Sequence, residues 1–376
     1  MPVSRLLPPL VALLLAASPL CAGTTAGDDA VRLNQIQVVG THNSYHSGFA
    51  PSAARLLEAK APKAYRSLDY RHPALAQQLD DGVRQLEIDV YADAKGGLYA
   101  HPAMDRLIAQ AGLPADPPMN DVATMDKPGF KVMHVEDIDQ RSSCQPFTAC
   151  LAEIRAWSKA HPRHLPLFIL VETKDKPLRN VQFKPVAPEP FTTAVFDALD
   201  RAVTSVFPRA EIVTPDDVRG GHATLPAAVA HGGWPTLAQA RGKVVFLLDQ
   251  KPASPAYLKG HPALRGRVFF TDAAPGRSDA AFIECNMCSA GKIDALVRQG
   301  YLVRTRTDDP AQGQGQHNDT RRRDAVLDSG AQMLSTDYPA GEPAASGYAV
   351  GFPGQRTLRC NPVLKPAGCD DDALER

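Results

Sequence analysis

The sequence predicts an α/β protein built as a (βα)8 TIM barrel, possibly a distorted one. Short apolar runs rich in β-branched residues recur eight times along the chain. Between several of these runs lie segments whose apolar residues are three or four positions apart, as on one face of a helix. Strands that alternate with helices favour a parallel sheet, and eight such units are typical of a closed barrel.

The predicted strands are short and mostly apolar, as strands buried on both faces are. In chain order they cover residues 36–39, 83–91, 131–135, 167–173, 244–248, 268–271, 301–306 and 333–336. Helical periodicity is visible in residues 150–161 and 190–206, and further helix-like segments at 292–299 and 321–329 precede the last two predicted strands. The interval 174–243 is long enough to contain an inserted lobe or an additional strand.

Length and composition are those of an ordinary globular protein. The chain has 376 residues, of which 44% are hydrophobic and 22% are charged, so it can bury a large core. Lys plus Arg and Asp plus Glu both number 41, and this zero net charge argues against a broad nucleic-acid surface. We expect one barrel domain over residues 23–376, with its core at about 34–340 and a loose, disulfide-pinned C-terminal tail.

Residues 1–22 have the features of a secretory signal peptide. Arg5 precedes an apolar run at 6–20, and small residues follow near Ala22, where we expect cleavage. The run is shorter than the roughly 20 residues that a transmembrane helix needs. Cys21 raises the alternative of a lipoprotein, but the bulky Leu20 before it disfavours lipidation. The mature chain is therefore expected to be secreted or periplasmic.

The remaining six cysteines agree with export. An even number of cysteines in an exported protein predicts disulfides, and six allow 15 pairings. Closeness in sequence favours the pairs 144–150, 285–288 and 360–369. Cys285 and Cys288 could instead form a redox motif or half of a zinc site. No second CxxC or histidine pair accompanies them, so a stapled loop is the better interpretation.

The predicted strand at 83–91 has an unusual acidic face. Glu87 and Asp89 lie on the same side of the strand, with no Lys or Arg between them. Two such carboxylates repel each other and are costly to desolvate unless a cation lies between them. Calcium or magnesium, which prefer oxygen ligands, would supply that cation. The alternative is a solvated acidic face.

Other polar residues follow the ends of neighbouring predicted strands. His42 and Asn43 follow the first strand, His134 lies near the end of the third, and Glu172 near the end of the fourth. In a barrel these ends meet at one rim, where active sites lie. Taken singly, each residue could be a core histidine, a turn asparagine or half of a salt bridge. Together they offer oxygen ligands for calcium and two histidines for proton transfer in phosphoryl chemistry.

Four segments together resemble the calcium-dependent phosphatidylinositol-specific phospholipase C family, in its bacterial secreted branch. They are GTHNSY at 40–45, GVRQLEID at 82–89, FKVMHV at 130–135 and LVE at 170–172. The resemblance extends over about residues 34–340. The set is specific as a group, although the Glu-x-Asp strand alone is shared with glycerophosphodiester phosphodiesterases.

The resemblance implies a metal site and a reaction. The calcium ligands would be Asn43, Glu87, Asp89 and Glu172, with magnesium less suitable. His42 would stabilise charge on the phosphoryl oxygens, and His134 would protonate the leaving glycerol oxygen. The nucleophile would be the inositol 2-hydroxyl, activated by calcium and a nearby carboxylate. The products would be diacylglycerol and a cyclic inositol phosphate.

The same resemblance implies a phospholipid substrate, met by a monomeric enzyme at a membrane or micelle surface. Four basic residues are candidates to bind phosphate or inositol oxygens, and each is equally well explained as half of a salt bridge. They are Lys174, Lys251, Arg304 and Arg306.

Two other functions remain open. His101 has the spacing from Glu87 at which a glycerophosphodiester or lysophospholipid phosphodiesterase places its second histidine. We favour His134, because the segment from it to Glu172 fits the phospholipase spacing. A catalytically inactive secreted protein that binds a headgroup is the third possibility. The presence of both histidines and all three carboxylates argues against it.

Overall fold

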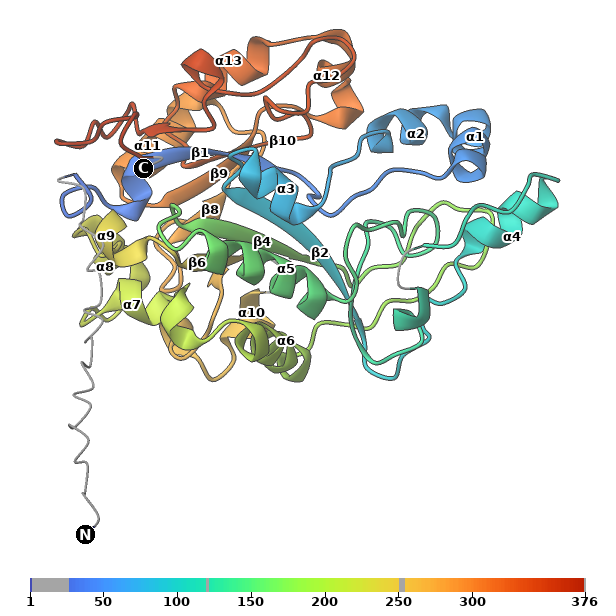
Figure 1. Cartoon of the computed structure of the whole chain (residues 1–376), viewed down its shortest axis with the longest axis horizontal. Helices are drawn as coiled ribbons and strands as arrows, with labels where there is room; N and C mark the ends of the chain where they lie inside the picture. Colours follow the sequence, from blue (N-terminus) through green and yellow to red (C-terminus); the bar gives the residue numbers. More distant parts are fainter. Residues whose placement is uncertain (2–26, 120–121, 250–253, 375–376) are drawn as a thin grey trace.

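The computed structural model describes residues 27–119, 122–249 and 254–374, with Met1. The predicted signal peptide lies almost wholly outside the described residues. The strands form one curled, mainly parallel sheet, and helices cover its outer face (Figure 1). Among the described residues, no helix is long and apolar enough to span a bilayer.

The strands differ greatly in length, and most are fully buried. They are β1 (Ile36–Thr41), β2 (Gln85–Asp93), β3 (Gly129–Val132), β4 (Leu167–Thr173), β5 (Ile212–Val213), β6 (Val244–Leu248), β7 (Phe270–Thr271), β8 (Phe282–Glu284), β9 (Leu302–Arg306), β10 (Met333–Thr336) and β11 (Leu358–Cys360).

Eight of these strands follow one another around a barrel. Parallel pairs connect β1, β2, β4, β6 and β7 in that order, and a second parallel series connects β8, β9, β10 and β1. A single parallel bridge between Asp272 and Phe282 joins β7 to β8. The predicted barrel is therefore confirmed, in a distorted form whose weakest join is between these two short strands.

One predicted barrel strand is wrong. The segment predicted at 131–135 forms β3, which runs antiparallel to β2 and lies outside the barrel. The reason is the length of β2, whose last residues, from Val90 to Asp93, pair with β3. The eighth barrel strand is instead β8, which the sequence did not predict because only three residues form it.

The helices range from single turns to four turns. They are α1 (Pro51–Lys60), α2 (Pro62–Leu68), α3 (Leu75–Asp80), α4 (Ala103–Gln110), α5 (Phe147–Ala160), α6 (Thr193–Val206), α7 (Pro215–Arg219), α8 (Leu225–Ala230), α9 (Leu237–Ala240), α10 (Ser254–Leu258), α11 (Ala290–Arg298), α12 (Gln314–His317) and α13 (Arg321–Leu327). The four predicted helices correspond to α5, α6, α11 and α13. The interval 174–243 contains α6 to α9 and the short strand β5.

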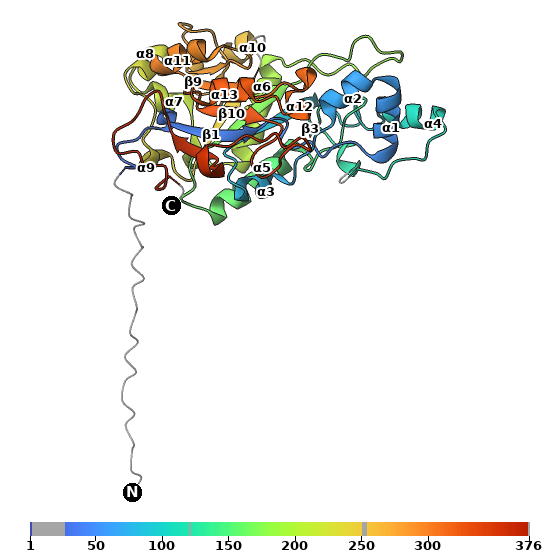
Figure 2. The ribbon, with the colours of Figure 1, turned by 90° about the horizontal axis from the view of Figure 1, so that it is seen from above.

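Helices α1, α2 and α4 project from one end of the barrel, and we call them, with the segment 111–118, the lobe (Figures 1 and 2). The lobe has a small apolar cluster of its own, formed by Ala53, Leu57, Met104 and Ile108. The main core is a separate and much larger cluster around the barrel strands and their covering helices.

The C-terminal tail is part of the main fold, so the prediction that it is loose is wrong. Strand β11 pairs antiparallel with β1, and Tyr348 and Val350 are fully buried in the main core. The three predicted disulfides are confirmed: Cys144–Cys150, Cys285–Cys288 and Cys360–Cys369.

Candidate active site

A polar cavity of about 450 Å³ opens at the carboxyl ends of the barrel strands. Its lining residues come from β2, β4, β8 and β9 and from the segments that follow β1, β6, β7 and β8. They are His42, Glu87, Glu172, Asp249, Asp272, Glu284, Asn286, Arg304 and Arg306. The parallel strands thus bring residues from distant parts of the sequence to one rim.

Glu87, Asp89 and Glu172 form an acidic cluster at this rim. Their carboxylate oxygens lie within 4.8 Å of one another, and Glu87 and Asp89 are buried. Burial raises the pKa of Glu87 to about 8, although the charge of Arg304 opposes the shift. Burial likewise raises the pKa of Asp89 to about 7, although Lys174 opposes it. Such carboxyl groups hold protons near neutral pH unless further positive charge is added.

Asn43 was predicted from the sequence as a further oxygen ligand. It lies in the turn after β1 at φ 47°, a left-handed conformation that asparagine tolerates. The backbone N–H of Ser44 donates to the carbonyl oxygen of Glu87 over 2.9 Å and holds this turn against β2. The amide nitrogen of Asn43 donates to the Tyr70 hydroxyl over 2.6 Å, while its oxygen Oδ1 is buried without a hydrogen-bond partner. An orphaned buried acceptor in a turn that is bonded to the backbone of Glu87 fits a hard cation such as Ca²⁺.

Lys174 is already engaged by the same cluster. Its Nζ lies 3.0 Å from Oδ2 of Asp89 and 2.8 Å from Oε2 of Glu172, and these carboxylates raise its pKa despite burial. The ammonium group therefore neutralises part of the cluster's charge. The salt bridge between Glu172 and Lys174, weighed as an alternative from the sequence, is present.

His42 lies at the end of β1 beside Asp337. Its Nδ1 is 2.8 Å from Oδ1 of Asp337, and a carboxylate there accepts the Nδ1 proton. Burial lowers the pKa of His42 well below its usual value, and the charges of Arg306 and Arg304 lower it further. The imidazole is therefore neutral at pH 7, with Nε2 as its acceptor nitrogen. The side chain is 16% exposed and lines the cavity.

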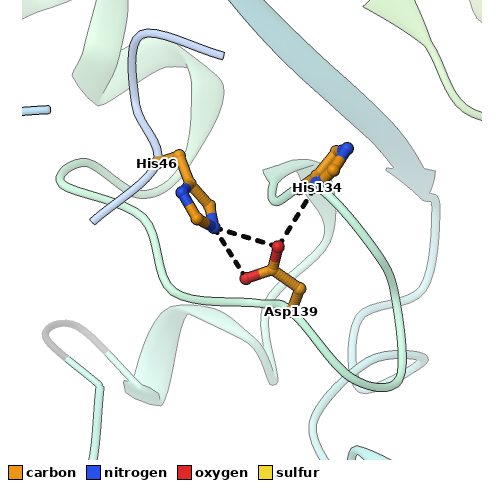
Figure 3. Close-up of side chains that lie close together, drawn as sticks. All are labelled: His46, His134 and Asp139. Atoms are coloured by element: carbon orange, nitrogen blue, oxygen red, sulfur yellow. Dashed lines mark hydrogen bonds and ion pairs between the residues drawn. The ribbon is translucent and has the colours of Figure 1, made fainter. Parts of the chain in front are cut away.

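His134 follows the antiparallel strand β3 by two residues and is held by a carboxylate in a similar way (Figure 3). Its Nδ1 lies 3.0 Å from Oδ2 of Asp139, and Nε2 of His46 lies 2.9 Å from both oxygens of the same carboxylate. Burial would raise the pKa of Asp139, but the two histidines hold it below its usual range. Burial lowers the pKa of His134, and the Asp139 hydrogen bond opposes that shift.

The two candidates for the second catalytic histidine, His134 and His101, differ in their surroundings. His134 and His42 are close enough for the charge of His134 to lower the pKa of His42. His101 is exposed just before α4, and neither it nor His134 is among the residues that line the polar cavity.

A second acidic group, Asp249, Asp272 and Glu284, was missed from the sequence as a site. These carboxylate oxygens also lie within 4.8 Å of one another. Arg304 lies between the two groups, because its Nη1 is 2.7 Å from Oε1 of Glu284 and its Nη2 pairs with Glu87. The sequence feature that could have revealed them is the one that revealed Glu172, because each of these acidic residues ends or follows a barrel strand.

The other predicted substrate contacts are mostly buried in ion pairs. Arg304 is 1% exposed at its side chain, and Arg306 is 11% exposed with Nη2 3.2 Å from Oδ2 of Asp337. Both line the cavity. Lys251 lies outside the described residues.

The family model for Ca²⁺-dependent phosphoinositide phospholipase C matches residues 31–362. The chain belongs to this family. It is thus a phospholipase C-type phosphodiesterase by family, and its cofactor is Ca²⁺. No curated protein matches the chain.

Two solved structures are similar to this phospholipase C-family chain over most of their length. For the calcium-dependent phosphoinositol-specific phospholipase C of Pseudomonas sp., the TM-score is 0.53 at 15% identity, covering 89% of this chain and 97% of that one. For the Ca²⁺-dependent phosphatidylinositol-specific phospholipase C of Streptomyces antibioticus, the TM-score is 0.51 at 20% identity, covering 82% and 95%. At these identities the likeness shows a shared fold.

Proposed function

We propose that the enzyme cleaves phosphatidylinositol at the glycerol–phosphate ester and forms diacylglycerol and a cyclic inositol phosphate. The observation that carries this proposal is that two histidines near the acidic cluster are each hydrogen-bonded to a carboxylate. His42 is held by Asp337, and His134 is held by Asp139. Attack by a substrate hydroxyl on phosphorus needs one group to remove a proton and another to supply one, and positioned imidazoles do both.

His42 is the base in this proposal. The resemblance implied that it stabilises phosphoryl charge, but its hydrogen bond to Asp337 favours proton removal by Nε2. The lowered pKa keeps the imidazole neutral, which is the form that can accept the proton of the inositol 2-hydroxyl. Asp337 orients the ring and stabilises the imidazolium that forms.

His134 is the acid. It donates a proton to the glycerol oxygen as the bond to phosphorus breaks, and Asp139 orients the ring. Asp139 also favours the protonated imidazole, because its hydrogen bond opposes the effect of burial on the pKa of His134. The buried His46 holds the other side of Asp139.

Asn43, Glu87, Asp89 and Glu172 would hold Ca²⁺. When bound, the ion lowers the pKa of the attacking hydroxyl and neutralises charge that develops on the phosphoryl oxygens. Lys174 then becomes available for a phosphate oxygen, because the carboxylates that hold it gain another partner.

The remaining polar lining suits a polyol headgroup. Asp249, Asp272 and Glu284 offer acceptors for inositol hydroxyls, and Arg304 and Arg306 offer donors for phosphate. Lys251 stays a candidate substrate contact.

We also propose that the chain is a single catalytic domain, exported after removal of residues 1–22, which acts as a monomer at a membrane or micelle surface. The three disulfides support export.

The test is phosphodiesterase activity of the mature chain on phosphatidylinositol and on glycerophosphoinositol, with Ca²⁺, Mg²⁺ or EDTA, resolved by phosphorus NMR. We expect cyclic inositol phosphate only with Ca²⁺. Release of glycerol phosphate instead would contradict the proposal and return His101 to consideration. Absence of turnover of both compounds would favour a headgroup-binding protein.

A further inference from the structure

The lobe contains an apolar pocket of about 400 Å³ that is distinct from the polar cavity. Helices α1 and α4 and the loop after β3 supply its apolar wall. That wall includes Phe49, Ala53, Pro102, Met104, Ile108 and Ile138. Among the residues that the structure describes, none lines both the apolar pocket and the polar cavity.

The polar residues of the pocket are largely used within the protein. Asp116 accepts the backbone N–H groups of Ser52 and Ala53, at 2.8 and 2.9 Å. Asp137 accepts the N–H of Ala103 at 3.0 Å, and the guanidinium of Arg141 donates to the carbonyl of Pro117. A ligand in this pocket therefore meets mainly carbon, so an apolar ligand fits it better than a polar one.

The pocket adjoins the catalytic histidine. Asp139 lines the pocket, and the same carboxylate holds Nδ1 of His134. His134 is thus one hydrogen bond away from the pocket wall, and its charge also acts on His42 in the polar cavity. If His134 protonates the glycerol oxygen, the glycerol leaves next to this histidine, whose partner Asp139 lines the pocket.

We propose that this pocket binds one acyl chain of the phospholipid substrate. The inference rests on the proposed function, because the direction of the leaving group follows from the role of His134. The occupant is an acyl chain rather than a protein segment, since the glycerol that His134 would protonate carries such chains and the carboxylate partner of His134 lines the pocket. The lobe therefore selects for lipid over the deacylated ester.

The test compares dihexanoyl and dibutanoyl phosphatidylinositol, both below their micelle concentrations, with glycerophosphoinositol. Each methylene that enters the pocket is worth about fourfold in kcat/KM. The two extra methylenes of one hexanoyl chain should therefore make the dihexanoyl lipid roughly 15-fold better than the dibutanoyl lipid. Ala115→Trp, at an exposed residue of the pocket lining, should abolish this preference and leave glycerophosphoinositol turnover unchanged. Ala109→Trp is the matched control, because Ala109 is exposed on α4 but does not line the pocket.

A second measurement separates this proposal from the proposed function. Binding of dansyl-undecanoic acid, followed by fluorescence in EDTA, needs neither metal nor turnover. We expect saturable binding that Ala115→Trp weakens at least tenfold and Ala109→Trp does not. If Ala115→Trp binds the probe as tightly as the wild type, the acyl site is overturned even if the enzyme is active. The same holds if the preference for the longer chain survives in Ala115→Trp. Probe binding in an inactive protein would support the site and contradict the proposed reaction.

Discussion

Nδ1 of His42 lies 2.8 Å from Oδ1 of Asp337, although the residues are 295 positions apart in the chain. The parallel register of β1 and β10 explains the contact, because Thr41 lies opposite Thr336 and the next residue of each strand extends over the rim. The backbone N–H of His42 also donates to the carbonyl of Thr336 over 2.9 Å. The pairing of β1 with β10, which closes the barrel, therefore brings His42 and Asp337 together.

Asp337→Asn should lower kcat by roughly 10²–10⁴ and change KM little, because the amide no longer fixes the His42 tautomer that accepts a proton. Steady-state formation of cyclic inositol phosphate measures the effect. Asp328→Asn, at an exposed carboxylate that pairs with Arg359, is the control and should keep full activity. A loss of less than tenfold in Asp337→Asn would argue against His42 as the base.

His134→Ala should lower kcat on phosphatidylinositol by roughly 10²–10⁴, because the glycerol oxygen then leaves without a proton. With a p-nitrophenyl inositol phosphate the loss should be much smaller, since that leaving group needs no protonation. His101→Ala, which removes an exposed histidine, should be within twofold of wild type on both substrates. Equal losses on both substrates in His134→Ala would contradict its role as the acid.

The barrel and much of the site could be predicted because their signals are local. Apolar runs mark the strands, and polar residues at the ends of the runs mark the rim, which is how Asn43 and Glu172 were predicted. The alternation of apolar and acidic residues within one run indicated Glu87 and Asp89. The antiparallel direction of β3 could not be predicted, because it depends on how far β2 extends beyond the barrel. Strand β8 was missed because three residues carry too little periodicity to be recognised.

The pairings within the site were also beyond the sequence. Which carboxylate holds His42 depends on the register between the first and last barrel strands. Likewise, Asp139 binds His134 because the turn after β3 folds back, with the His134 N–H donating to the Asp139 carbonyl over 3.2 Å. Sequence distance gives no indication that Arg304 pairs with Glu87, 217 residues away.

Calcium affinity should weaken as the pH falls from 9 to 6. The metal-free pKa values of about 8 for Glu87 and about 7 for Asp89 mean that Ca²⁺ must displace protons near neutrality. For each proton that Ca²⁺ displaces, the Kd for Ca²⁺ rises by up to tenfold for each unit by which the pH falls. Calorimetry in two buffers of different ionisation enthalpy measures both the Kd and the protons released. Affinity that is constant over this range would contradict the assignment of these ligands.

The same groups predict how calcium removal affects stability. A raised carboxyl pKa means that the folded chain binds more protons than the unfolded one, so these groups lower stability as pH rises from about 4 through about 8. Bound Ca²⁺ removes this loss of stability at high pH, because it stabilises the ionised carboxylates in the folded chain. At a concentration 100 times its Kd it contributes about 2.7 kcal/mol, or on the order of 5 °C in Tm. Thermal unfolding should therefore show a larger loss on adding EDTA at pH 8.5 than at pH 5.5.

Lys174→Met should separate the structural role of this residue from its role toward substrate. In EDTA we expect a loss of about 2 kcal/mol, because Asp89 and Glu172 lose the ammonium group that lies within 3.0 Å of both. In Ca²⁺ that loss should shrink, and the Kd for Ca²⁺ should tighten, because the metal no longer competes with the ammonium group. If Lys174 also binds phosphate, kcat/KM should fall at least tenfold at saturating Ca²⁺.

The matched control is Lys176→Met, which removes an exposed ammonium group 3.7 Å from Asp175 and should leave stability, calcium affinity and turnover unchanged. Chemical unfolding with and without Ca²⁺, together with calcium titration, distinguishes the outcomes. Equal destabilisation of Lys174→Met in Ca²⁺ and in EDTA would mean that the lysine and the metal do not share these carboxylates. The ion would then have to lie elsewhere on the rim, and the second acidic group around Glu284 would become the position to test.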